Sequence, residues 1–150
     1  MALKIKLLTE DAMIPTRATP ESAGLDLFAN EKIQIEPGII EQIKTDISMA
    51  IPEDSYGRIA ERSSLALKGL SITGGVVDRD YRGEIIVILK NCTQKPVIIQ
   101  KHQKIAQLII TKVYFSKIEV VEELNTTERG ENVLDGVINS QMKLTWKSNR

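Results

Sequence analysis

The chain has 150 residues, 42% of them hydrophobic, which is enough for one globular domain with a sizeable core. Lysine plus arginine number 20 and aspartate plus glutamate also number 20, so the formal net charge is zero. A zero net charge argues against a general nucleic-acid binder, whose affinity needs an excess of positive charge, and it permits self-association.

The single cysteine and the single histidine, Cys92 and His102, exclude a disulfide framework and a zinc cluster built from those side chains. Cys92 is therefore expected to be a structural residue. The longest apolar run, Ile85–Leu89, is far too short to span a bilayer, and the first residues are unlike a signal peptide. We expect no nucleic-acid partner, no membrane partner, and an intracellular location in the cytoplasm or nucleus.

Short segments with alternating apolar residues recur along the chain, which is typical of strands. Turn residues separate them, for example at Glu36-Pro37-Gly38. One short helix is predicted over Ser63–Lys68, with Ser63 as its N-cap. Many short strands at regular spacing predict an all-β sandwich or barrel. The predicted strands are Leu3–Leu7, Leu25–Phe28, Ile33–Ile35, Ile39–Ile43, Ile47–Ile51, Gly57–Ala60, Val76–Val77, Gly83–Lys90, Val97–Ile99 and Ile105–Phe115.

The stretch from Gly74 to Glu84 stands out by its chemistry. Two glycines precede the strand Val76–Val77, and an Asp-x-x-Tyr unit precedes the next strand. We expect the residues from Asp78 to Arg82 to form the tip of a hairpin between these two strands. Such a tip brings a carboxylate and an aromatic ring together beside glycine backbone that a ligand can approach closely.

Four segments carry a more specific signal than any one of them alone. They are Ala23–Leu27, Gly57–Ala66, Gly75–Gly83 and Lys104–Ile109, and the third contains Asp78-Arg79-Asp80-Tyr81-Arg82-Gly83. In this order and spacing they resemble the trimeric deoxyuridine triphosphatases (dUTPases), over about residues 3–130. The resemblance implies a jelly-roll subunit of a three-fold homotrimer whose active sites are shared between subunits.

The same resemblance implies an activity and a cofactor. The family hydrolyses dUTP to dUMP and pyrophosphate with Mg²⁺, which limits uracil incorporation into DNA and supplies dUMP for thymidylate synthesis. By the resemblance, Asp78 orients and activates the attacking water, and Asp26 binds Mg²⁺ through water. The implied substrate-binding residues are Arg62, Ser63, Ser64 and Gln107 for phosphates, Gly75, Val76 and Val77 for uracil, Tyr81 for deoxyribose, and Arg129 for the γ-phosphate.

Three features depart from the family pattern. Glu61 replaces a usual proline, and we expect its carboxylate to weaken phosphate binding by like-charge repulsion. Ser64 replaces a common glycine. The glycine-rich arm that closes over the nucleotide begins at Arg129-Gly130, but Leu134 then replaces the phenylalanine that stacks on uracil. We therefore divide the chain into a dUTPase-like β domain, residues 1–130, and a degenerate arm and tail, residues 131–150, and expect slower turnover.

Two alternatives to an active dUTPase stay open at this point. One is a dUTPase-like nucleotide-binding regulator with little turnover, which the altered arm favours. The other is deoxycytidine triphosphate deaminase, a family with the same fold and a similar phosphate segment at Arg62–Ala66. The stretch from Asp78 to Gly83 follows the triphosphatase pattern, and it contains no convincing deaminating glutamate.

Overall fold

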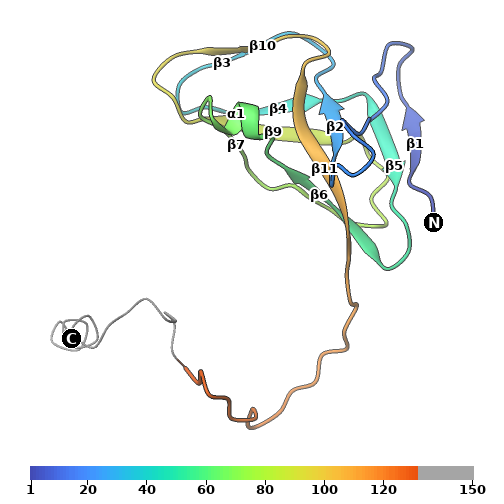
Figure 1. Ribbon diagram of the computed structural model, residues 1–150, viewed down its shortest axis with the longest axis vertical. Helices are drawn as coiled ribbons and strands as arrows, with labels where there is room; N and C mark the ends of the chain where they lie inside the picture. The colour runs from blue at the N-terminus through green and yellow to red at the C-terminus, as the bar shows by residue number, and fades with distance from the viewer. Residues whose placement is uncertain (132–150) are drawn as a thin grey trace, which may run out of the picture. The chain divides into compact units, whose positions relative to one another are not determined.

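A computed structural model describes residues 1–131 of the chain, and the regular secondary structure of this part is almost all β (Figure 1). All strand pairings are antiparallel. The elements are β1 (Lys4–Leu7), β2 (Leu25–Phe28), β3 (Ile33–Ile35), β4 (Ile40–Lys44), β5 (Ile47–Ala50), β6 (Ser55–Ala60), α1 (Ser63–Ala66), β7 (Leu70–Ile72), β8 (Val76–Val77), β9 (Ile86–Asn91), β10 (Val97–Ile99) and β11 (Lys104–Lys112).

Two sheets position the candidate site. A four-stranded sheet has the order β2-β11-β6-β8, and a three-stranded sheet has the order β4-β9-β7. Two further pairs, β1-β5 and β10-β3, extend the fold at its ends (Figure 1). Because side chains alternate along a strand, each sheet turns one row of apolar residues inward. Leu27, Ile59 and Leu108 of the first sheet join Val87 and Leu89 of the second in one buried core.

The all-β, jelly-roll-like prediction is confirmed, but the predicted hairpin at Asp78 is wrong. Strand β8 pairs with β6, whereas β9 pairs with β4 and β7. The residues from Asp78 to Arg82 therefore cross from one sheet to the other. The prediction failed because alternation identifies strands but does not state which strands pair.

The helix is also shorter than predicted and starts differently. Helix α1 has Arg62 as its N-cap and no side-chain capping hydrogen bond, so the assignment of Ser63 as the cap is wrong. Strand β7 was missed, because its three residues lie in a short segment between the helix and two glycines.

The chain divides into two compact units, Met1–Phe115 and the residues from Ser116 onward. The first unit contains every strand described above. In the second, the described residues are exposed. Among residues 1–131, no helix is long and apolar enough to cross a membrane.

Candidate functional site

A buried carboxylate lies in β2, the edge strand of the four-stranded sheet that pairs with β11. Asp26 in β2 is only 6% exposed. Arg62 Nε donates a hydrogen bond to its Oδ1 at 2.9 Å, and Lys104 Nζ lies 2.9 Å from its Oδ2. The lysine is close enough for charge pairing, although Oδ2 receives no aligned hydrogen bond. Two cations thus share one buried negative charge, which leaves a local excess of positive charge.

Strand register explains why these groups meet. Strand β11 lies between β2 and β6, so Gln107 faces Asp26 on one side and Ala60 on the other. Gln107 Nε2 donates to the Glu61 carbonyl oxygen at 2.7 Å. A Cβ at Gly24 would overlap the Gln107 side chain, so only glycine leaves room for this amide. We call Asp26, Arg62, Lys104 and Gln107 the Asp26 cluster.

The start of helix α1 lies next to this cluster. Arg62 is extended at φ −91° and ψ 133°, and its carbonyl oxygen accepts from the N–H groups of Leu65 and Ala66. The N–H groups at the beginning of any helix lack such intrahelical acceptors. Ser63 and Ser64 occupy these positions and are exposed. The sequence-predicted phosphate residues Arg62, Ser63, Ser64 and Gln107 therefore fall in one neighbourhood.

The predicted water-activating residue is on a different segment. We call the residues from Asp78 to Gly83 the Asp78 loop, and the side chains from Asp78 to Arg82 are exposed. The Tyr81 N–H donates to the Asp78 carbonyl oxygen at 3.1 Å, and Tyr81 Oη donates to the Glu84 carbonyl oxygen at 3.0 Å. The Tyr81 ring lies directly against Gly83, where a Cβ would overlap it. Tyr81 is 46% exposed, so part of its side chain is open to solvent.

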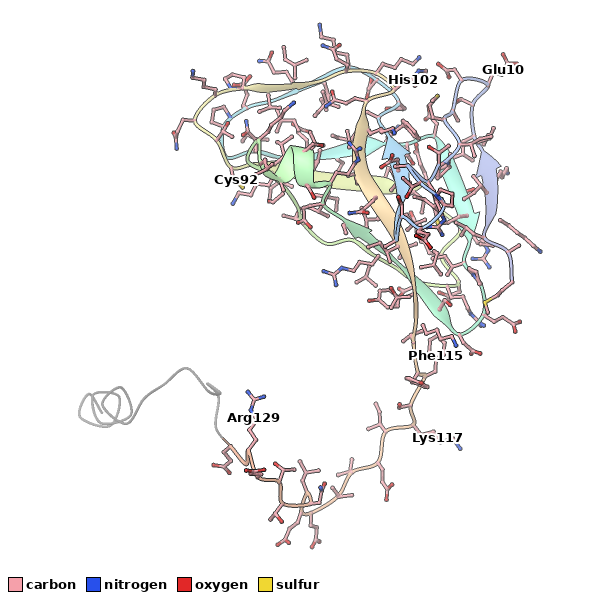
Figure 2. All side chains as sticks on the ribbon, in the orientation of Figure 1. Glu10, Cys92, His102, Phe115, Lys117 and Arg129 are labelled. Carbon is pink, nitrogen blue, oxygen red and sulfur yellow. The ribbon has the colours of Figure 1, made fainter. Side chains whose placement is uncertain are left out.

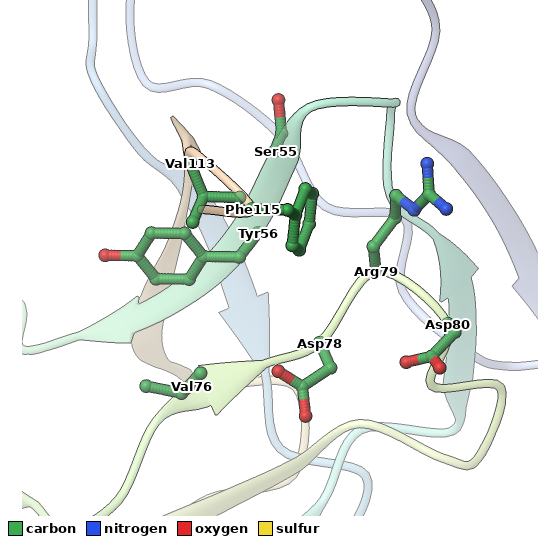
Figure 3. A pocket seen from close by; sticks show the side chains of 8 residues that line it. All are labelled: Ser55, Tyr56, Val76, Asp78, Arg79, Asp80, Val113 and Phe115. Atoms are coloured by element: carbon green, nitrogen blue, oxygen red, sulfur yellow. The ribbon is translucent and has the colours of Figure 1, made fainter. Parts of the chain in front are cut away.

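A cavity of about 480 Å³ adjoins Asp78 (Figure 3). Arg79 Cζ lies 5.9 Å from the centre of the Phe115 ring, within the range of a cation–π contact. The cavity combines apolar walls with two carboxylates at its edge, which suits a ligand with both apolar and polar parts. Its lining residues are Ser55, Tyr56, Val76, Asp78, Arg79, Asp80, Val113 and Phe115.

The Asp26 cluster and the Asp78 loop lie at opposite ends of β6. Val76 pairs with Arg58 and Val77 with Gly57, so the chain reaches Asp78 near Tyr56. Arg62 instead follows Ala60, at the other end of the strand. The four steps from Tyr56 to Ala60 span roughly 13 Å at about 3.3 Å per residue. Within one chain, the two predicted groups are therefore separated.

The remaining residues that the sequence singled out lie on other segments. The Gly75 carbonyl oxygen accepts from Ile59 N–H at 2.7 Å, which fixes the predicted uracil segment against β6. Arg129 belongs to the second unit. Cys92 and His102 occupy separate exposed positions, so the thiol and the imidazole do not meet (Figure 2). Sequence reasoning missed Lys104, whose position depends on a register shift in β11 that no residue pattern indicates.

A family model described as dUTPase matches residues 10–135. The chain belongs to the dUTPase family. Among named relatives, the deoxyuridine 5'-triphosphate nucleotidohydrolase of rabbitpox virus (strain Utrecht) is 47% identical over 123 residues, which cover 82% of this chain and 84% of the relative. The corresponding protein of vaccinia virus (strain Copenhagen) has the same identity and coverage.

Solved dUTPase structures agree with this assignment. A mutant of the Staphylococcus bacteriophage 80alpha dUTPase with dUpNHpp has a TM-score of 0.83 and 29% identity, over 89% of this chain and 96% of that one. A mutant dUTPase from phage phi11 of S. aureus, described with a structural Mg(II) ion, has a TM-score of 0.79 and 27% identity, over 84% of this chain and 100% of that one. The fold and the family therefore agree.

Proposed function

We propose that this dUTPase hydrolyses dUTP to dUMP and pyrophosphate, which limits uracil incorporation into DNA and supplies dUMP for thymidylate synthesis. Its membership of the family supports this activity. The structural observation that carries the proposal is the buried Asp26 carboxylate between Arg62 and Lys104, because it assembles positive charge for a triphosphate.

Asp78 is the proposed general base. Its carboxylate accepts a proton from a water molecule while the water oxygen attacks the α-phosphorus. The bond from the α-phosphorus to the α–β bridging oxygen breaks, and pyrophosphate leaves. Asp78 is exposed on its loop and accepts no side-chain hydrogen bond from residues 1–131, so both carboxylate oxygens have room for water.

Arg62, Ser63, Ser64 and Gln107 are the proposed phosphate-binding groups. Asp26 engages only the Nε of Arg62, which holds the guanidinium plane and leaves its terminal nitrogens to donate to phosphate oxygens. The hydroxyls and N–H groups at the start of α1 add further donors. Donors aimed at the bridging oxygen stabilise the charge that develops on the leaving group.

Tyr81 and the segment Gly75–Val77 are the proposed nucleoside-binding groups. Gly75 has φ +106°, and a Cβ there would overlap the Ile59 carbonyl oxygen, so a side chain is excluded at this point. Its backbone can therefore approach a pyrimidine edge closely. The Tyr81 ring, fixed by its hydroxyl and by Gly83, offers a flat surface for deoxyribose. Contact that close rejects a 2′-hydroxyl by size.

Mg²⁺ is the proposed cofactor, and the residues fit it. Residues 1–131 contain no cluster of three or more acidic, cysteine or histidine side chains that could hold a metal alone. Mg²⁺ in nucleotide sites is held mainly by phosphates and water, with one or two carboxylates. Asp26 Oδ2 is buried beside Lys104 Nζ and receives no aligned hydrogen bond, so it could accept one from such a water once the Lys104 side chain moves aside. Bound there, the ion would neutralise charge on the phosphates.

A homotrimer with shared sites is the proposed assembly. The separation of Asp78 from Arg62 along β6 supports it, because one chain alone does not place both beside one triphosphate. Exposed apolar side chains beyond the first unit support association as well, since they favour burial against another surface. Ile118 is 95% exposed, Val120 94% and Leu124 84%.

The carboxyl-terminal arm is proposed to modulate the rate. Arg129 is suited to clamp the γ-phosphate, because a guanidinium binds phosphate through two parallel hydrogen bonds. Leu134 and the rest of the altered arm lie outside the described residues. We propose residues 1–130 as the catalytic β domain and 131–150 as an arm whose departures slow closure.

Pyrophosphate release with Mg²⁺ tests the function. We expect release from dUTP and much less from dCTP, dTTP and UTP, and no ammonia from dCTP. Ammonia release would instead indicate the deaminase. Tight binding of a dUTP analogue without turnover of dUTP would indicate the nucleotide-binding regulator, which the comparisons do not favour.

A further inference from the structure

Glu61 makes two hydrogen bonds that reach two different sheets. It lies between the end of β6 and the start of α1. Its carbonyl oxygen accepts from Gln107 Nε2 at 2.7 Å, within the four-stranded sheet. Its carboxylate Oε1 accepts from the Ile72 N–H at 3.1 Å, in the three-stranded sheet. One residue thus links the proposed phosphate-binding groups to the strand that leads into Gly74 and Gly75.

The Ile72 N–H needs an acceptor from outside its own sheet. Strand β7 is an edge strand that pairs only with β9. On that side, Cys92 N–H donates to the Gly69 carbonyl oxygen and Thr73 N–H donates to the Ile88 carbonyl oxygen. Hydrogen bonds alternate sides along an antiparallel strand, so the Ile72 N–H between them points to the open edge. The Glu61 carboxylate supplies its acceptor there.

The Glu61 carboxylate also adds a hydrogen bond beyond the last backbone hydrogen bond that β6 makes on this side. Strand β6 pairs with β8 at Gly57 and Arg58, and Ile59 N–H then donates to the Gly75 carbonyl oxygen at 2.7 Å. Beyond Ile59, the Glu61 side chain makes the next connection to the Ile72–Gly75 segment. The segment is therefore held near both of its ends, by the backbone of Ile59 and by the side chain of Glu61.

We propose that Glu61 is a positioning residue that holds the Ile72–Gly75 segment in place for the nucleoside and thereby sets the KM for dUTP. The proposal rests on the proposed function of this site. It replaces the expectation that this carboxylate acts mainly by repelling phosphates. One of its oxygens is already engaged by a backbone N–H, and its loss would loosen the segment at Ile72, although the Thr73 and Gly75 backbone hydrogen bonds remain.

Two substitutions separate positioning from repulsion. Glu61→Gln removes the charge but keeps a side-chain oxygen that can accept from Ile72 N–H, whereas Glu61→Ala removes both. Positioning predicts a rise in KM of roughly three- to tenfold for Glu61→Ala, with kcat within about twofold of the parent chain. It predicts a KM for Glu61→Gln no higher than about twice that of the parent.

Amide hydrogen exchange provides a readout that does not depend on turnover. We expect the Ile72 amide to exchange faster in Glu61→Ala and at the parent rate in Glu61→Gln. The Cys92 amide, which donates to the Gly69 carbonyl oxygen at 2.9 Å, is the matched control and should stay protected in all three proteins. A protected Cys92 amide also shows that Glu61→Ala is folded.

Each outcome has one meaning. A lower KM in both variants would overturn the proposal in favour of charge repulsion. Parent values of KM in both variants, or an unchanged Ile72 amide in Glu61→Ala, would overturn it as well. A parent chain that releases no pyrophosphate from dUTP would refute the proposed function instead. The exchange rate of the Ile72 amide would still test the hydrogen bond from Ile72 to Glu61 separately, and an unchanged rate in Glu61→Ala would refute that role.

Discussion

The Asp26 cluster and the Asp78 loop differ in how they are built. Paired strands fix the cluster: Asp26 and Gln107 face each other across β2 and β11, and the carboxylate is buried between two cations. Local hydrogen bonds and a cation–π contact from Arg79 to Phe115 hold the loop, and Asp78 and Tyr81 are exposed. The Asp26 cluster is therefore ordered without ligand, whereas the Asp78 loop of the single chain is open to solvent.

Removing the proposed base should have the largest effect. Asp78→Asn keeps the size of the side chain but removes the proton acceptor, so we expect kcat to fall at least about 100-fold. Binding of a non-hydrolysable dUTP analogue should stay within about threefold of the parent, because the Asp26 cluster is untouched. Asp80→Asn, two residues further along the loop, is the matched control and should keep most of the turnover. Equal turnover in Asp78→Asn and the parent would refute the assigned role.

Disrupting the preorganised cluster should weaken both folding and binding. Arg62→Ala removes the hydrogen bond to Asp26 Oδ1 and leaves the buried carboxylate with Lys104 alone. We expect a loss of about 1–3 kcal/mol in the free energy of unfolding, together with a higher KM for dUTP. Urea denaturation and steady-state kinetics measure the two effects.

A double variant separates the two roles of Arg62. Adding Asp26→Asn to Arg62→Ala removes the buried negative charge that Arg62 no longer pairs, so stability should recover in part while KM stays high. Full recovery of KM would show that Arg62 acts only on Asp26 and does not bind phosphate.

Changes at Tyr81 should alter selectivity more than rate. Tyr81→Ala removes the surface proposed to support deoxyribose, and we expect the preference for dUTP over UTP to fall roughly tenfold. Tyr81→Phe loses only the hydrogen bond to the Glu84 carbonyl oxygen and should retain the preference. Competition between dUTP and UTP measures this directly. Unchanged selectivity in Tyr81→Ala would place the sugar elsewhere.

An exposed ion pair outside both regions should have the smallest effect. A hydrogen bond from Lys101 lowers the pKa of Asp11, and the same bond raises the pKa of Lys101. The lowered pKa of Asp11 adds stability at a pH above the ordinary pKa of an aspartate, and this stability is lost as the pH falls below about 4. The raised pKa of Lys101 adds stability that is lost only in strong alkali. The difference in melting temperature between parent and Asp11→Asn should be small, and it should shrink in acid and again in strong alkali.

Sequence reasoning succeeded where local pattern decides structure. Alternation located most strands, and four segments identified the family. It failed where pairing decides: β8 joins β6 rather than β9, and Lys104 reaches Asp26 through a register shift in β11. Glu61 was identified as a departure, but its acceptor role toward Ile72 depends on which edge of β7 is open. No single-strand pattern contains that information.

Mixing two impaired variants tests whether the Asp26 cluster and the Asp78 loop of different copies form one site. The Asp78→Asn protein and the Arg62→Ala protein are mixed in equal amounts, unfolded and refolded together. Pyrophosphate release from dUTP is then measured. If each site takes Asp78 from one copy and Arg62 from another, random mixing should restore roughly a quarter of the parent activity. Activity no higher than that of the separate variants, in a mixture that has exchanged subunits, would contradict a shared site.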